Sequence, residues 1–388
     1  MNPIDELRAA RPAHLGERPV DEHTRAVELA RAMSGPRRPK AARRRSAAVR
    51  PAWGLGLAGA AAAAVTAVAV VMSGNGPTTP PAPDGGRLAV SESPGSTSAP
   101  RVKLSAREVL LAAAEKAGRQ REGSGDYWHS VTVLRTLFAA KQGGYLVVEK
   151  QRSEGWTPSA TGGEQWFRSQ SLGVQPAGET DRQAWERAGS PSEIEIVVPG
   201  KRLAATLSTS EGKVRTDRSP LVDGDKVFWL GKNVSMQDLR ELPGDPGKLK
   251  RWLLASYKGH GTESSSEKMS GDVWLFRVSV GLIMDMPVTP EVRGAAFRML
   301  AELDGVEVTE DVTDSENRQG TAVSIEEPGP RGGVTENRLI FDEETGRPLA
   351  VETVAVKPGK EESAFEPGLV RSSNVLLEAG WTDARPAS

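Results

Sequence analysis

The sequence predicts an α+β fold in which a curved antiparallel sheet carries inserted helices. Segments that alternate apolar and polar residues occur at 127–171 and again at 306–356, and short turns join most of them. Strands joined by short turns cannot be parallel neighbours, because a parallel pair needs a long crossover. Between the two sets, residues 235–303 have helical spacing of their apolar residues. Strands and helices grouped in this way are typical of an α+β domain.

The first expected element of this domain is a helix at 105–118. Ser105 can cap it, and Glu108 three residues later completes a capping-box pattern. Strands follow, and the Lys141 to Gly144 turn separates the first two. The expected strands lie at 127–137, 145–156 and 165–171, with short ones at 194–198 and 226–230.

The middle of the domain is predicted to be helical, and its end returns to strands. Helices are expected at 236–242, from 246 to 257, at 272–284 and from 289 to 303, with Ser235, Asp245 and Thr289 at their starts. The last expected strands lie at 306–312, 320–326, 337–341 and 349–356. Asp342 to Gly346 reads as a hairpin turn with glycine in a left-handed position. Trp381 is interpreted as a packing anchor for the tail.

A membrane anchor is predicted ahead of the domain. Residues 37–50 carry seven basic residues and no acidic one, and residues 52–72 carry no charge over 21 positions. A helix needs about 20 apolar residues to cross the hydrocarbon of a bilayer. Because basic residues cluster on the cytoplasmic side, residues 1–51 are expected inside the cell and the C-terminal domain outside. A cleaved signal peptide is the alternative, although the leading segment is long and no clear cleavage site follows.

The segments on either side of this helix have distinct expected roles. Within the cytoplasmic segment, Asp21 can cap a short amphipathic helix that ends at Gly35-Pro36, so residues 20–35 are a candidate site for a cytoplasmic protein partner. Residues 73–100 are rich in Pro, Gly, Ser and Thr and have few large apolar groups. Such a segment is expected to be a disordered linker. It connects the membrane helix to an extracytoplasmic domain at 101–388.

Composition excludes several classes of function. The chain has no cysteine, which removes disulfides, thiol nucleophiles and cysteine-based zinc sites. Residues 1–51 hold 12 Lys and Arg against 6 Asp and Glu, whereas residues 52–388 hold 38 against 45. The basic excess therefore lies beside the membrane, where anionic headgroups attract it. Without a folded reader or interleaved aromatic residues, it does not indicate nucleic-acid binding.

No motif in the sequence predicts catalysis, a metal site or a cofactor. His129 and His260 are the only histidines in the large domain, and they are interpreted as a packing residue and a turn residue. Two S-x-x-K matches, at 210–213 and 265–268, lack the context of penicillin-binding enzymes, and no nucleotide-binding glycine motif is present. The acidic runs Asp311, Asp314, Glu316 and Asp223 to Asp225 lack the spacing of a calcium loop and are interpreted as solvated turns. The protein is therefore not expected to be an enzyme.

The tryptophans leave two interpretations open. Eight of nine lie beyond the linker, where they either fill a core that has no disulfides or line a concave apolar site for a lipid or a glycan. They are Trp128, Trp156, Trp166, Trp185, Trp229, Trp252, Trp274 and Trp381.

Four segments of helix starts, turns and strands carry a resemblance to a known family. They are Asp5 to Arg8, Leu242 to Pro246 with Leu249 and Leu253-Leu254, Leu303 to Val306, and Leu339 to Asp342 with Thr345-Gly346. Through these segments the chain resembles, from end to end, an uncharacterised family of actinobacterial single-pass membrane proteins known only by a locus-tag name. The family has no established activity, and its members are associated with extracytoplasmic-function sigma factors. The resemblance therefore implies a regulatory setting and no catalytic residue.

Two functions follow from the sequence. In the first, the outer domain senses or binds a ligand, and the cytoplasmic tail regulates a partner such as a sigma factor. In the second, the outer domain is a membrane-anchored binding or carrier domain for an apolar ligand, a lipid or a cell-wall component. Its sheet would then resemble the curved half-barrels of lipoprotein carriers, and the tail would have no signalling role.

Overall fold

The computed structural model describes residues 105–198, 204–261, 268–329 and 332–386. The segments predicted to be cytoplasmic (1–51), membrane-spanning (52–72) and a linker (73–100) lie outside these residues. No helix in the described part of the chain is both long and apolar enough to cross a membrane.

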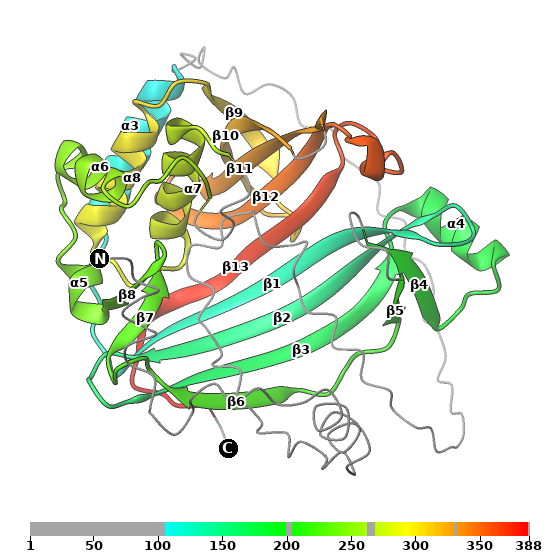
Figure 1. Ribbon diagram of the computed structural model, residues 1–388, viewed down its shortest axis with the longest axis horizontal. Coiled ribbons are helices and arrows are strands. Elements are labelled where there is room, and N and C mark those ends of the chain that lie inside the picture. Colours follow the sequence, from blue (N-terminus) through cyan, green and yellow to red (C-terminus); the bar gives the residue numbers. More distant parts are fainter. Residues whose placement is uncertain (1–104, 199–203, 262–267, 330–331, 387–388) are drawn as a thin grey trace, which may run out of the picture. The chain divides into compact units, whose positions relative to one another are not determined.

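The described residues form an α+β domain around a large antiparallel sheet (Figure 1). Nine strands follow one another in the order β6-β3-β2-β1-β13-β12-β11-β10-β9, and β4 and β5 extend the sheet from the end of β1. Their bounds are β1 Tyr127–Ala140, β2 Leu146–Pro158, β3 Glu164–Pro176, β4 Glu193–Val197, β5 Ala204–Ser208, β6 Arg215–Pro220, β9 Val306–Thr313, β10 Gln319–Pro328, β11 Val334–Asp342, β12 Arg347–Lys357 and β13 Val370–Thr382. A separate hairpin consists of β7 Lys226–Trp229 and β8 Lys232–Ser235.

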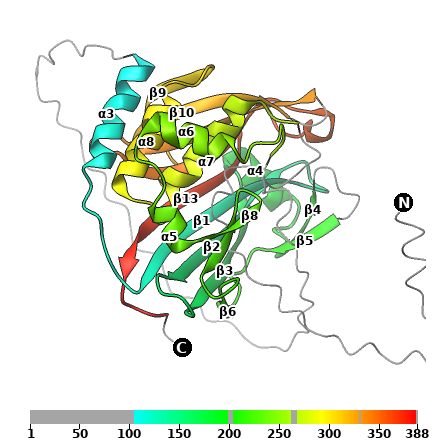
Figure 2. The ribbon, with the colours of Figure 1, turned by 60° about the vertical axis from the view of Figure 1, so that its left-hand side comes forward.

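The helices gather over one half of the sheet. Figures 1 and 2 show α3, α6, α7 and α8 over β9 to β12, whereas β1, β2, β3 and β6 extend away from them. The bounds are α3 Ala106–Gly118, α4 Glu179–Arg187, α5 Met236–Arg240, α6 Pro246–Leu254, α7 Gly271–Met284 and α8 Pro290–Leu300, with a 3₁₀ turn at Lys360–Glu362. The main core lies between this helical layer and the sheet, with α7 almost wholly buried.

Side-chain caps start these helices as the sequence predicts. Ser105 and Glu108 form the expected capping box at α3. Ser235, Asp245 and Thr289 each accept a hydrogen bond from the backbone of the first turn of α5, α6 and α8. Because such caps satisfy backbone N–H groups that a helix leaves unpaired, the starts of these helices are encoded locally.

The turn between β11 and β12 is held against α3. Gly346 has a φ of +68°, and a Cβ atom there would lie 2.8 Å from the carbonyl oxygen of Ala113. The ammonium of Lys116 donates to the carbonyl of Glu343 at 2.6 Å, and the amide of Gln120 donates to the carbonyl of Thr345 at 3.2 Å. These contacts place the first residues of β12 beside the end of α3.

The strand β13 is absent from the sequence prediction, which placed no strand after residue 356. The structure shows β13 between β1 and β12, in the middle of the sheet. Val375 is buried in a cluster on one face and Leu376 in the main core on the other. A strand covered on both faces loses the alternation by which strands are recognised. The strands β5, β6 and β8 and helix α4 were also not predicted, and α6 ends at Leu254 rather than at 257.

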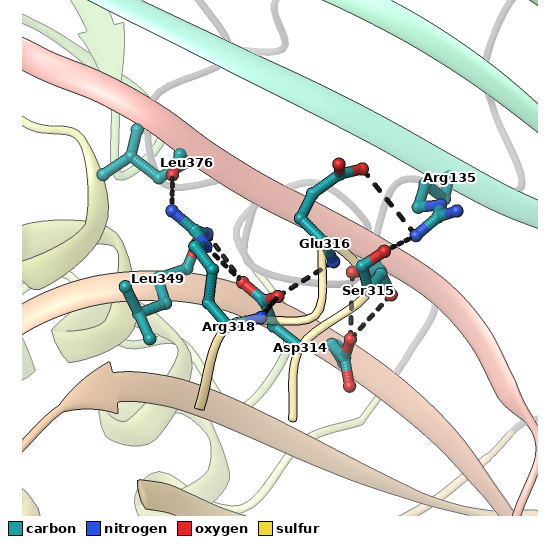
Figure 3. A network of polar contacts seen from close by, with 9 residues as sticks. Arg135, Asp314, Ser315, Glu316, Arg318, Leu349 and Leu376 are labelled. Carbon is teal, nitrogen blue, oxygen red and sulfur yellow. Dashed lines mark hydrogen bonds and ion pairs between the residues drawn. The ribbon is translucent and has the colours of Figure 1, made fainter. Parts of the chain in front are cut away.

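The face opposite the helices has a smaller core of its own. It consists of Val133, Ala322, Ile340, Ala350 and Val375, from five different strands. The tip of the β9–β10 hairpin folds across this face and reaches β1. There the Arg135 guanidinium donates to the carbonyl of Ser315 and lies 3.8 Å from the carboxylate of Glu316 (Figure 3). The sheet therefore bends far enough for one hairpin tip to contact a strand four positions away.

Candidate functional site

The candidate site lies where β12 and β13 separate. The two strands pair from Ala350 opposite Val375 to Val354 opposite Val370. Beyond this stretch β13 continues to Thr382 and pairs with β1 alone, while β12 turns back toward β11. The two halves of the sheet thus part at one end of β13, as Figure 1 shows.

A β-bulge marks the point of separation. Val131 of β1 pairs with Glu378, and the next residue, Thr132, pairs with Leu376, so Leu377 has no partner on β1. Its side chain is 42% exposed, which is unusual for a leucine in the middle of a sheet. Bulges bend a strand and redirect its side chains, and here the bulge turns β13 away from β12.

Arg318 bridges the two separating strands. Its guanidinium donates to the carbonyl of Leu349 on β12 at 2.8 Å and to that of Leu376 on β13 at 3.0 Å (Figure 3). Its Nε donates to the carboxylate of Asp314 at 2.8 Å. Asp314 also accepts from the backbone N–H groups of Glu316 and Arg318 itself. The charge and the donors of Arg318 are therefore used to hold the hairpin tip in place.

A cavity of about 240 Å³ opens at this separation. One part of its wall is apolar, and the other carries three arginines and two acids. The lining residues are Gln120, Ile283, Met284, Arg293, Arg318, Asp342, Arg347, Pro348, Leu349, Leu376, Leu377, Glu378 and Ala379. They come from the residues just after α3, from α7 and α8, from the β9–β10 turn and from β11, β12 and β13, so the cavity exists only in the folded domain.

Arg293, in the first turns of α8, is the most enclosed charge at the cavity. Its guanidinium donates to the carbonyl of Met286 at 3.2 Å and lies 5.4 Å from the centre of the Trp128 ring. Burial, followed by repulsion from Arg347, lowers the pKa of Arg293 to about 10, while attraction to Asp285 acts in the opposite direction. Arg293 is therefore still charged at neutral pH, and it lies within the field of a second positive charge.

Asp285 ends α7 and lies close to Arg293 without forming an ion pair with it. Burial raises the pKa of the Asp285 carboxyl to about 7, against the opposing effects of Arg293 and of a hydrogen bond to its own backbone. Its backbone carbonyl accepts a hydrogen bond of 2.6 Å from the indole N–H of Trp128. Near neutral pH this carboxyl is only partly ionised, so its negative charge balances the positive charge of Arg293 only in part.

Arg347, the first residue of β12, is exposed at the cavity wall. Its guanidinium has no hydrogen bond or ion pair with any other described residue. The residue opposite it in the hairpin is Asp342, whose carboxylate accepts from the backbone of Glu344 at 2.8 Å and from the hydroxyl of Thr345 at 2.7 Å. The carboxylate of Asp342 is therefore engaged by the β11–β12 turn.

No family model matches the chain, and no curated protein matches it. The properties of the site are therefore argued from its own geometry. An apolar wall beside two guanidiniums that have no ionic partner among the described residues can bind a small molecule.

Neither histidine singled out in the sequence lines this cavity, although His129 lies next to Glu378 of its wall. His129 is on β1 and stacks on Trp156 with ring centres 4.6 Å apart, so it is a packing residue. Its Nδ1 lies 3.4 Å from a carboxylate oxygen of Glu378. His260 lies at an isolated bridge to Lys268. Within the described ranges, no three His, Cys, Asp or Glu side chains are grouped so that they could hold a metal ion.

The interpretation of Asp311, Asp314 and Glu316 as a solvated turn is only half right. Asp311 lies in β9, and Asp314 and Glu316 lie in the β9–β10 turn, but Asp314 is buried at 4% exposure and paired with Arg318. The sequence shows an acidic run, whereas the partners of these carboxylates come from the turn itself and from β1. Of the two S-x-x-K matches, 210–213 is an exposed loop, and most of 265–268 lies outside the described residues.

None of the eight tryptophans lines the cavity. Trp128, Trp229 and Trp274 are buried in the main core, and Trp252 and Trp381 pack against it. The packing interpretation therefore describes these five side chains. Trp128 also supports the site, because its ring faces Arg293 and its indole binds the end of α7.

The sequence offered no signal for Arg293 and Arg347. They are 54 residues apart, on a helix and on a hairpin, and no motif surrounds either. What brings them together is the packing of α8 and of the β11–β12 turn on α3, next to the strand β13 that alternation does not reveal.

Proposed function

We propose that this protein is a single-pass membrane protein whose extracytoplasmic domain binds a small ligand in the cavity between β12 and β13. The observation that carries the proposal is the cavity itself, in which an apolar wall lies next to arginines that have no ionic partner in the described domain. Small-molecule sites are usually concave and combine apolar surface with a few polar groups that orient the ligand.

The topology completes the proposal. Residues 1–51 would lie in the cytoplasm, 52–72 would cross the membrane, 73–100 would be a disordered linker, and 101–388 would lie outside with a curved sheet. Residues 20–35 would hold a cytoplasmic protein partner, for which a sigma factor is the candidate. The likeness to the actinobacterial membrane family, on which the sigma-factor assignment rests, stays a prediction. The order of these segments supports a relay from the outer domain to the tail.

The alternative, a membrane-anchored carrier of a lipid or a cell-wall component, is less well supported. Drug-sized ligands occupy sites of about 300–1,000 Å³. The cavity of about 240 Å³ is below that range, so it has no room for a lipid with full acyl chains. The bend that brings the β9–β10 tip to β1 is a feature that a half-barrel carrier would share.

Two measurements test the proposal. Native mass spectrometry of the full-length chain, purified in a mild detergent, should show a bound small molecule or one that binds on addition. A pull-down with the full-length chain should recover a specific cytoplasmic protein, and a variant without residues 20–35 should lose it. Absence of any small-molecule binding would refute the sensing role of the outer domain. Equal recovery with and without residues 20–35 would refute the relay.

A further inference from the structure

We propose that the ligand of the cavity is a small oxyanion, a carboxylate or a phosphate, held between the guanidiniums of Arg293 and Arg347. This inference rests on the proposed function, because it names the chemistry of the ligand that binds at the same cavity. Its apolar part would lie against Ile283, Met284 and Leu376.

Two like charges face one cavity without ionic partners among the described residues. Arg293 contacts a backbone carbonyl and an aromatic ring, and neither carries a formal charge. The guanidinium of Arg347 has no hydrogen-bond or ionic partner among the described residues, and it repels Arg293. An anion between the two would be stabilised by both charges. Guanidiniums present several N–H donors in a planar fork that matches the oxygens of carboxylates and phosphates.

Arg318, in the same wall, differs from Arg293 and Arg347 in its partners. Arg318 has a carboxylate partner and two carbonyl acceptors, so it holds the fold together and has little to offer a ligand. Arg293 donates to a single backbone carbonyl, and neither Arg293 nor Arg347 has a carboxylate partner among the described residues. Of the three arginines in the cavity wall, Arg318 is therefore engaged by the fold, and Arg293 and Arg347 are available to a ligand.

The acids near the cavity do not neutralise these two arginines. Asp342 is engaged with its own turn, and the side chain of Glu378 is 66% exposed and lies near His129. Asp285 is the one acid close enough to Arg293 to affect its pKa. The ionised carboxylate of Asp285 would therefore compete with the bound anion for Arg293, so ionisation of Asp285 should weaken anion binding.

The size and wall of the cavity limit the rest of the ligand. A volume of about 240 Å³ admits an anionic group with a few carbon atoms. Leu376, Leu377 and Pro348 offer apolar surface, and burying a CH₂ group is worth about 0.8 kcal/mol. A short aliphatic carboxylate should therefore bind more tightly than acetate.

Isothermal titration calorimetry of the full-length chain with four compounds tests the inference. Inorganic phosphate and hexanoate represent the two anions, acetate lacks the apolar part, and hexanamide has the shape of hexanoate without its charge. Hexanoate should bind at least about tenfold more tightly than hexanamide, since a hydrogen bond to a charged group is lost in the amide. Comparison of phosphate with hexanoate shows which oxyanion the cavity prefers.

Arg347→Gln should weaken the binding of the preferred anion by about tenfold or more, because it removes one guanidinium. Arg251→Gln is the matched control, since Arg251 is an exposed arginine on α6 outside the cavity wall. Equal affinity for hexanoate and hexanamide, unchanged in Arg347→Gln, would overturn the inference and leave a neutral-ligand site. Absence of binding by every probe and of any copurified ligand would refute the proposed function as well.

Discussion

The indole Nε1 of Trp128 donates a hydrogen bond of 2.6 Å to the backbone carbonyl oxygen of Asp285. This bond joins the start of β1 to the residue that follows α7. It also holds in place the residue whose carboxyl lies next to Arg293. The wall of the cavity therefore depends on a contact between residues that are 157 positions apart.

Trp128→Phe should destabilise the domain by roughly 1–3 kcal/mol, because a buried carbonyl loses its donor while most of the ring packing remains. Urea unfolding followed by circular dichroism would measure the loss. Trp185→Phe is a suitable control, since Trp185 makes a comparable bond to the carbonyl of Pro191 in a separate, smaller cluster. Only the first substitution should also change ligand binding, and an equal effect of both would contradict the supporting role of Trp128.

Asp285 should make the stability of the domain depend on pH. Its folded pKa of about 7 lies above the ordinary value of 3.8, so the folded state keeps a proton that the unfolded state releases. Stability should therefore fall as the pH rises from about 4 to about 7, and level off above that. A shift of this size corresponds to at most roughly 4 kcal/mol.

Asp285→Asn isolates this contribution. The difference in unfolding free energy between the variant and the parent should grow in favour of the variant as the pH rises from 4 to 7. The same variant should bind the anion more tightly than the parent at pH 8, where the parent carboxyl is ionised. A constant difference across this range would show that Asp285 titrates normally.

Glu327→Ala should be among the most destabilising single substitutions, at about 3–5 kcal/mol, because it leaves a buried charge unpaired. Glu327 of β10 forms an ion pair with Arg277 of α7 and accepts from Asn337 at 2.9 Å. Both ionic side chains are only 12–13% exposed. Thermal and urea unfolding measure the cost. The double variant Arg277→Met/Glu327→Leu should recover much of it, and failure to recover would indicate that the loss comes from packing alone.

Gly346→Ala and Gly144→Ala form a matched pair. Both glycines have a left-handed φ, of +68° and +65°, but a Cβ at Gly346 would lie 2.8 Å from the carbonyl of Ala113, whereas a Cβ at Gly144 would meet nothing within 4 Å. Each variant should lose about 1 kcal/mol from backbone strain. Gly346→Ala should lose more and should also weaken ligand binding, because it pushes the β11–β12 turn from α3. Equal losses would show that this turn is not pressed on the helix.

Local signals made much of the fold predictable. The Ser105 capping box, the Thr289-Pro290 start and the Asp342 to Gly346 turn are encoded by adjacent residues, and the structure confirms all three. The α+β class with an antiparallel sheet follows from short turns between alternating segments. Signals of this kind say which elements form and where they begin.

The candidate site was not predictable, because its determinants are long-range. The middle of β13 is buried on both faces, at Val375 and Leu376, and a bulge follows at Leu377, so the strand lacks the alternation that identifies other strands. Without β13 there is no separation from β12 and no cavity. The roles of Arg293, Arg318 and Arg347 differ only through their partners, and no sequence pattern tells a structural arginine from an available one.

Arg293 and Arg347 are expected to bind a small anion, whereas Arg318 is not. Nuclear magnetic resonance of the arginine Nε–H groups, in the full-length chain titrated with hexanoate or phosphate, tests this difference most directly. Signals assigned by single Arg→Lys variants should shift for Arg293 and Arg347 with a common affinity and stay unchanged for Arg318. A titration that shifts neither Arg293 nor Arg347, or that moves Arg318 as strongly as these two, would contradict the account.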